Sequence, residues 1–150
     1  MMSQPVTFQF ERPEDSPGYL LWQVTMSWQR EIKHALDPLD LTHTQFVLLA
    51  AIAWLARHQE EVTQVDVATH SSTDRMMVSK VLRTLQSKGL ISRQEHPTDT
   101  RAKVVRLTGA GQDRIQQAIR VVEATDGMYF APLGIDLPFF RSQMQLLLNR

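Results

Sequence analysis

The apolar positions near the N-terminus recur with a helical period. From residue 19 to residue 36 they stand three or four residues apart, which places them on one face of a helix. These positions are Leu21, Val24, Trp28, Ile32 and Ala35. Pro38 should end this helix, because proline disfavours helical backbone in the residue before it. Residues 1–17 contain three prolines and mixed charges, so a loose arm is expected before the helix.

A second helix is predicted to begin after Thr42. Thr42 and Gln45 stand in the S/T-x-x-E/Q relation of a capping box, in which each residue satisfies a backbone N–H of the other. The run from Phe46 to Leu55 is nearly all apolar. We therefore expect this helix to be central to the core.

Segment 63–89 combines two helix signals with a turn between them. Thr63 and Asp66 repeat the capping signature, and the polar run 71–74 offers several N-caps for a longer helix. Gly89 is the expected left-handed end of that helix. The apolar face of the longer helix consists of Val78, Val81, Leu82 and Leu85. Another face carries Arg75, Met76, Ser79, Lys80 and Arg83.

Two short strands, at 91–93 and 104–107, are predicted after this helix. Between them, the sequence His-Pro-Thr-Asp at 96–99 is a turn signal. Thr108 can cap a long helix that runs to about residue 124, where Gly127 and Pro132 interrupt it. A last helix is expected to open at Asp136 or Pro138 and to end near Leu148.

Positive charge concentrates in the same part of the chain. The chain as a whole is neutral, with 16 Lys or Arg and 16 Asp or Glu. Residues 70–106, however, contain eight bases and three acids, which gives +5 there and −5 elsewhere. A basic segment with a helix-turn-helix shape is the electrostatic footprint expected of a protein that reads duplex DNA.

Composition excludes several classes of function. A chain of 150 residues fits one domain. No apolar run approaches the roughly 20 residues of a membrane span, and no signal peptide is visible, so a cytoplasmic protein without a membrane partner is expected. The absence of cysteine excludes disulfides and thiolate sites. The five histidines show no i, i+4 pair, so neither a metal nor another cofactor is expected. No phosphate loop or nucleophile–base signature points to an enzyme.

Together these segments resemble the MarR family of winged helix-turn-helix regulators. The resemblance covers roughly residues 20–125. The matching stretches are LTHTQF at 41–46, TQVDVA at 63–68, VSKVLRTLQSKGLI at 78–91 with Arg93, HPTDTRAK at 96–103 and LTGAG at 107–111. A helix-turn-helix pattern alone would be a weak signal, but this long ordered combination is specific.

The resemblance implies a mainly α fold with a small β-wing and an α-helical dimerisation base. We expect one compact domain with an N-terminal arm at 1–17, a helical dimerisation region at 18–40 and 108–150, and a winged helix-turn-helix DNA-binding region at 41–107. It also implies a homodimeric transcriptional regulator, expected to be a repressor. Its two recognition helices would bind a pseudo-palindromic double-stranded DNA operator one turn, roughly 10 bp, apart.

The exposed face of the helix at 73–83 supplies groups suited to the major groove. Arg75 is expected to make a bidentate contact to guanine, and Met76 to meet a thymine methyl group. Lys80 and Arg83 are expected to hold phosphates, which position a protein without reading sequence. The hydroxyls expected to donate to phosphates or bases are Ser71, Thr73 and Ser79.

The predicted wing is a second DNA-binding device. Pro97 and Asp99 shape a tight loop, and Arg101 projects from it toward the narrow minor groove, whose negative potential attracts arginine. The resemblance implies that Asp99 orients Arg101. Lys103 and Arg93 would flank the wing at phosphates.

The predicted DNA-binding residues also have simpler structural interpretations. The charges at 75–83 could form a solvated helix face, and Asp99 with Arg101 could merely stabilise a hairpin turn. Met76 and Met77 could both be packing residues, and Met77 is expected in the core. As a whole, the chain could be a winged-helix protein-interaction module in a larger assembly, without DNA binding.

The resemblance also implies control by a small phenolic or other aromatic effector. It would bind between the dimerisation region at 18–40 and 108–150, called the base below, and the DNA-binding region at 41–107, called the head. The candidate contact residues are Trp22, Met26, His43 and Phe46. Their alternative role is packing in the dimer interface, where aromatic residues and methionine are common, and the two roles are compatible. A regulator without any small ligand is the third alternative.

Overall fold

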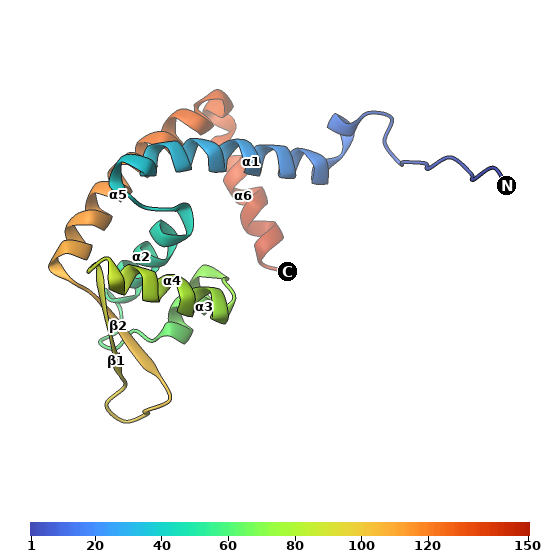
Figure 1. Cartoon of the computed structure of the whole chain (residues 1–150). Coiled ribbons are helices and arrows are strands. Elements are labelled where there is room, and N and C mark those ends of the chain that lie inside the picture. The colour runs from blue at the N-terminus through green and yellow to red at the C-terminus, as the bar shows by residue number, and fades with distance from the viewer.

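The structure is a computed structural model that describes all residues, 1–150. It is mainly helical with one two-stranded antiparallel sheet (Figure 1), which confirms the expected fold class. The helices are α1 (Pro17–Leu36), α2 (His43–Leu55), α3 (Gln64–Ser71), α4 (Arg75–Ser87), α5 (Gly109–Phe130) and α6 (Leu137–Leu148). The strands are β1 (Ile91–Glu95) and β2 (Lys103–Leu107). Short 3-10 turns lie at η1 (Pro13–Asp15), η2 (Asp37–Leu39) and η3 (Ala131–Asp136).

The predicted helix caps form in the structure. Thr42 and Gln45 make a reciprocal capping box at the start of α2, with both backbone N–H to side-chain oxygen distances at 3.1 Å. Thr63 and Asp66 do the same for α3. Of the candidate caps before α4, Asp74 is the one used, and its carboxylate accepts the backbone N–H groups of residues 76 and 77.

The strands β1 and β2 form a hairpin longer than the sequence indicated. They pair from Ile91 opposite Leu107 to Glu95 opposite Lys103. Gly89 has φ +76°, as expected of a left-handed residue at the end of a helix. An isolated bridge between Thr63 and Val104 ties the hairpin to the start of α3.

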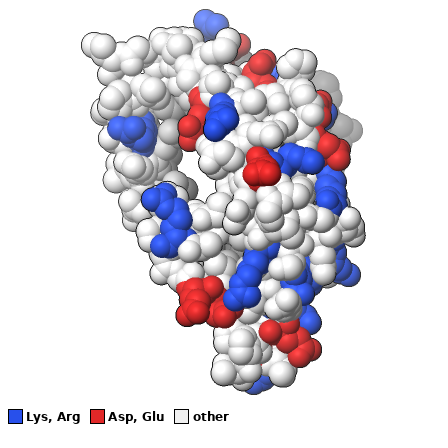
Figure 2. Space-filling view, turned by 90° about the vertical axis from the view of Figure 1, so that its left-hand side faces the viewer, with Lys and Arg blue, Asp and Glu red and all other residues white.

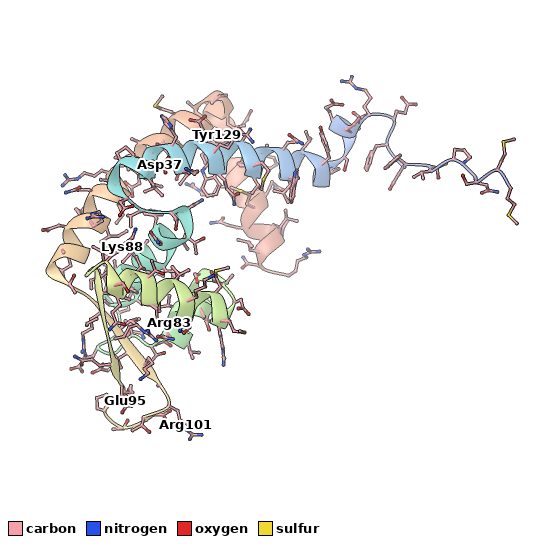
Figure 3. The ribbon with its side chains drawn as sticks, in the orientation of Figure 1. Asp37, Arg83, Lys88, Glu95, Arg101 and Tyr129 are labelled. Atoms are coloured by element: carbon pink, nitrogen blue, oxygen red, sulfur yellow. The ribbon has the colours of Figure 1, made fainter.

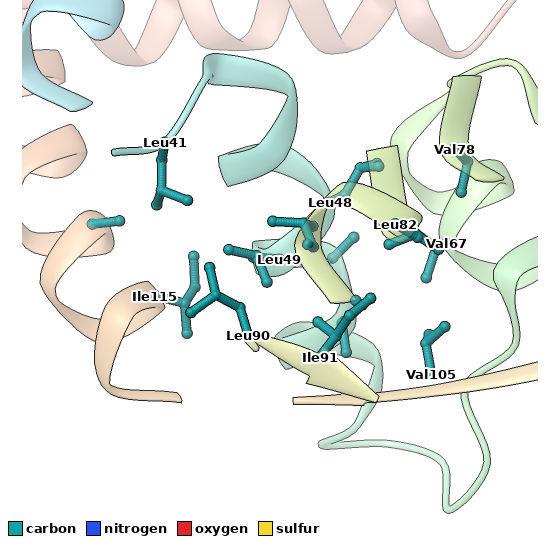
Figure 4. Packing of buried hydrophobic residues seen from close by; sticks show 14 of the residues in the cluster. Leu41, Leu48, Leu49, Val67, Val78, Leu82, Leu90, Ile91, Val105 and Ile115 are labelled. Carbon is teal, nitrogen blue, oxygen red and sulfur yellow. The ribbon is translucent and has the colours of Figure 1, made fainter. Parts of the chain in front are cut away.

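The core lies where the C-terminal end of α1 meets α2, α3, α4, the hairpin and α5 (Figure 4). Helix α2 is central to it, as expected, and Leu48, Leu49 and Ile52 are fully buried. Helix α4 contributes its predicted apolar face: Val78, Leu82 and Leu85 are buried, and Val81 is partly buried. The apolar spacing of α4 therefore fixes which side of this helix faces solvent.

The expected end of the long C-terminal helix near residue 124 was wrong. Helix α5 continues through Gly127 to Phe130. One glycine lowers helix propensity by only about 1 kcal/mol, which neighbouring helical residues offset. The break comes later, at Gly134 in η3, where φ is +54°. Helix α6 then ends at Leu148, as predicted.

Large apolar side chains are exposed at the two ends of the chain. The arm extends away from the body (Figure 1), and Phe8 is 84% exposed. Helix α6 buries none of its residues.

No single helix is long and apolar enough to cross a membrane. The sharply bent pair Pro17–Leu39 and His43–Leu55 passes that test together, on length and composition alone.

Candidate nucleic-acid interface

Helices α3 and α4 form the expected helix-turn-helix. Ser72 turns the chain with φ +52°, and Asp74 then caps α4. Val67 and Ala68 of α3 are buried in the same cluster as the apolar face of α4. The turn residues are local in sequence, and this explains why the sequence alone located the motif.

The outward face of α4 presents cationic and apolar groups to solvent. Arg75, Lys80 and Arg83 are exposed, and Met76 is 81% exposed. Figure 3 shows Arg83 on α4 in the same half of the molecule as Arg101 on the wing. The predicted DNA contacts Arg75, Met76, Lys80 and Arg83 are therefore all accessible to a partner.

Met77 is not a core residue, contrary to expectation. Its side chain is 49% exposed. The buried positions of α4 are Val78, Leu82 and Leu85. Met77 precedes Val78 by one residue, which rotates it about 100° away from that buried stripe.

Ser71 and Thr73 are placed differently from the exposed α4 cations. The Ser71 hydroxyl donates to the carbonyl of Val67 at 2.7 Å, and the Thr73 hydroxyl donates to that of Ser71 at 3.2 Å. Both residues are partly buried and line a cleft between α1 and the head. Ser79 is partly buried, and its carbonyl accepts from Arg83 at 3.4 Å.

The wing tip carries the predicted Asp99–Arg101 pair. The Asp99 carboxylate accepts the backbone N–H of Arg101 at 3.1 Å and lies 3.7 Å from its Nε. The Arg101 side chain is 95% exposed, and it points away from the hairpin (Figure 3). Lys103 lies 4.0 Å from Glu95 across the strands. The backbone bond makes Asp99 a turn-former as well as a partner of the arginine.

Arg93 joins the wing to both helices of the motif. Its Nε donates to Oε1 of Gln64 on α3 at 2.7 Å, and its Nη1 donates to Oε1 of Gln86 on α4 at 3.5 Å. Burial, and then the like charge of Arg83, lower the pKa of Arg93. Local sequence patterns could not show the contact with Gln64, because Gln64 stands 29 positions from Arg93.

Several bases of the basic segment are held within the protein. The Lys88 ammonium donates to the Asp40 carbonyl at 2.6 Å and to Oε1 of Gln45 at 3.2 Å. Arg106 pairs with Glu61 at 2.8 Å. The side of the molecule formed by α5 mixes both signs of charge (Figure 2). The exposed positive charge of this segment is therefore mainly on α4, and the wing tip adds Arg101, which lies beside Asp99.

A cleft of about 720 Å³ separates α1 from the head. Most of the residues that line it are polar, and they include charged groups from both sides. The lining residues are Gln29, Lys33, Asp37, Asp40, Leu41, Thr42, His43, Thr44, Val47, Ser71, Thr73, Met77 and Lys88. Lys33 pairs with Asp37 at 3.0 Å on the α1 side.

Only one of the four effector candidates lines this cleft. His43 does, and its ring meets Trp28 edge-on with centroids 5.0 Å apart. Trp22 is 63% exposed on the N-terminal half of α1. Met26 is partly buried, and Phe46 packs against the core. The sequence analysis did not propose Trp28, Lys33 or Lys88 as ligand contacts, although Lys33 and Lys88 line the cleft.

Trp28, His43 and Asp126 connect α1, α2 and α5 behind the cleft. The Trp28 indole N–H donates to Asp126 at 2.8 Å. Burial lowers the pKa of His43, and the nearby Asp126 carboxylate opposes that change. The imidazole is therefore held toward its neutral form at the junction of the base and the head.

Comparisons with known proteins agree with this geometry. Residues 37–124 match the family described as ArnR1-like, winged-helix domain. The chain is 47% identical over 122 residues to the uncharacterized HTH-type transcriptional regulator YdcH of Bacillus subtilis (strain 168), covering 81% of this chain and 83% of that protein.

Two solved structures share both fold and sequence similarity. One is a cysteine-to-serine mutant of MarR from E. coli complexed with operator DNA, with 28% identity and a TM-score of 0.76, covering 91% of this chain and 94% of that one. The other is CouR from Rhodococcus jostii RHA1 bound to p-coumaroyl-CoA, with 27% identity and a TM-score of 0.78, covering 93% of each chain.

These similarities favour a DNA-binding regulator over a protein-interaction module. They extend over the helix-turn-helix, the wing and the flanking helices, so they involve the whole arrangement rather than one motif. The chain belongs to the MarR family of winged helix-turn-helix transcriptional regulators.

Proposed function

We propose that this protein is a dimeric repressor that binds a pseudo-palindromic operator, with α4 in the major groove and the wing in the minor groove. The observation that carries the proposal is that exposed cations occur on two elements of the same motif. They lie along α4 and at the wing tip, where Arg101 is exposed. The operator complex of the similar MarR protein supports it. Arg75 would read guanine, while Lys80 and Arg83 would hold phosphates.

The apolar surface left exposed by the single chain supports the dimer. A large exposed apolar surface is typical of a site that another surface covers. Helix α6 contains six large apolar residues besides Leu137 and buries none. Leu21 and Trp22 of α1 are more than 60% exposed as well. A second copy of the chain would cover these surfaces.

Selection of bound duplexes from a random pool tests the DNA-reading part of the proposal. We expect enrichment of two matching half-sites about one DNA turn apart. On the selected operator, Arg75→Ala should reduce discrimination at one base position by about 1–3 kcal/mol. Arg101→Ala should weaken binding mainly where the minor groove is narrow.

Arg120→Ala is the matched control, because Arg120 is an exposed arginine on α5, away from both surfaces. It removes the same charge and should leave affinity nearly unchanged at fixed salt. Equal losses in all three variants would mean that only net charge matters. Retention of DNA without enrichment, collapsing as salt rises, would also contradict sequence reading.

We further propose that a small aromatic ligand with polar groups binds in the cleft and releases the operator. The polar lining of the cleft and its position between base and head support this, as does the CouR complex with p-coumaroyl-CoA. Titration with small aromatic acids should change the fluorescence of Trp28, whose ring contacts the cleft residue His43. The change should be lost in Trp28→Phe but kept in Trp54→Phe. A broad panel without any change in fluorescence or thermal stability would contradict the ligand proposal.

A further inference from the structure

His96 follows β1 and places one ring nitrogen inside the turn of the wing. Its Nδ1 accepts the backbone N–H of Thr98 at 3.2 Å and the backbone N–H of Asp99 at 3.3 Å. The Thr98 hydroxyl lies 3.2 Å from the same nitrogen. The backbone of His96 also closes the base of the turn, since its N–H donates to the Ala102 carbonyl at 3.0 Å.

This arrangement requires a particular form of the imidazole. A backbone N–H can only donate, so Nδ1 must present its lone pair, and the ring proton must be on Nε2. A protonated ring would carry an N–H at Nδ1 as well. That N–H would face two backbone donors, and the ring would have to leave the turn.

The turn held by His96 also holds the wing arginine. Asp99 donates its backbone N–H to His96 and accepts the backbone N–H of Arg101 with its carboxylate. The same carboxylate lies 3.7 Å from the Arg101 Nε. The imidazole, the carboxylate and the guanidinium therefore form one chain of contacts at the tip of the wing.

We propose that neutral His96 is a positioning residue for the wing, and that its protonation releases the turn and weakens operator binding. Histidine is the side chain whose charge ordinarily changes between about pH 5 and 8. The inference rests on the proposed function, because it assumes that Arg101 contacts DNA.

The other charged groups of the wing do not replace this role. They are the carboxylates of Asp99 and Glu95 and the cations of Arg101 and Lys103, and each pairs within the wing. Either carboxylate would attract an imidazolium, whereas the two backbone N–H groups in the turn would repel it. That attraction does not restore the lost hydrogen bonds, because Nδ1 of the charged ring has no lone pair to accept the two backbone N–H groups.

Operator affinity measured from pH 8 to pH 5.5 at constant ionic strength tests the proposal with wild type and His96→Asn. Asparagine places Oδ1 two bonds from Cβ, as Nδ1 is, and commonly accepts N–H groups two or three residues ahead without titrating. We expect wild-type affinity to fall roughly fivefold more than that of the variant, the size of an ordinary lost hydrogen bond. The four other histidines remain in both proteins, so the difference reports His96.

A parallel NMR titration without DNA separates failure of this inference from failure of the proposed function. The ¹⁵N shifts of His96 should show an unprotonated Nδ1 at pH 8, and the Thr98 and Asp99 amide signals should shift with the same midpoint as the ring. A proton on Nδ1 at pH 8, or identical affinity profiles for wild type and His96→Asn, would overturn the inference. If the amide signals shift with the ring as expected but the protein binds no operator at any pH, the proposed function is refuted instead.

Discussion

At the scale of single residues, His43 shows how burial changes chemistry. It begins α2, lies against the Trp28 ring and lines the cleft. Loss of water around the imidazole lowers the pKa of His43, and the Asp126 carboxylate only partly opposes this. The folded protein therefore disfavours the charged form more than the unfolded chain does.

This lowered pKa predicts acid sensitivity of the free energy of unfolding. Above the ordinary value of 6.5 the ring is neutral in both states, and His43 adds no pH dependence. As the pH falls below 6.5, the unfolded chain binds the proton first, so stability is lost. Urea unfolding at pH 7 and pH 5 should show a larger loss for wild type than for His43→Gln. An equal loss in both proteins would contradict the lowered pKa.

At the scale of elements, the start of α5 packs unusually close to the end of the α4–β1 connection. A Cβ on Gly111 would lie 1.9 Å from the Leu90 carbonyl oxygen. Thr108 caps α5 through Gly111, and its hydroxyl also donates to the Gly89 carbonyl at 2.6 Å. The glycine is needed here for close approach of two backbones, not for an unusual φ.

Gly111→Ala should therefore destabilise the protein by about 1–3 kcal/mol, as overpacking of a tight contact does. Gly109→Ala is the matched control, since it lies in the same helical turn with open space at its Cβ. It should be neutral or stabilising by up to about 1 kcal/mol, because alanine favours helix. Urea midpoints for the two variants measure the difference. Indistinguishable midpoints would show that α5 can shift away from Leu90 at no cost.

At the scale of the whole molecule, the single chain leaves an unusual amount of apolar surface uncovered. The arm extends away from the body (Figure 1). No residue of α6 is buried. On α6, Leu147 lies between Phe139 and Met144 around the helix, whereas Gln145 lies on the polar side beside Arg141. The two sides of this helix therefore have different expected partners.

Leu147→Glu should dissociate the proposed dimer, because it places a charge in the apolar side of α6. Light scattering after size exclusion should then give the mass of one chain. Gln145→Glu adds the same charge on the polar side and should remain dimeric. Circular dichroism should show folded protein in both, since neither residue is buried in the single chain. A wild-type protein that is monomeric at micromolar concentration would refute the dimer itself.

The sequence by itself determined the features that depend on near neighbours. Capping boxes at Thr42 and Thr63 join residues three positions apart, and the period of α4 fixes its buried and exposed faces. The left-handed Gly89 and the wing turn are likewise local. The long ordered motif was specific enough to indicate the family, which the comparisons confirmed.

Only the tertiary structure decided which distant groups meet. Trp28 and Asp126 stand 98 positions apart, and Arg93 and Gln64 stand 29 apart. Periodicity could not show that Lys88 is held by Asp40, or that one effector candidate, His43, lines the cleft while the others do not. Local hydrogen bonds and helical period act within about one turn of chain, whereas these contacts depend on how whole elements pack against one another.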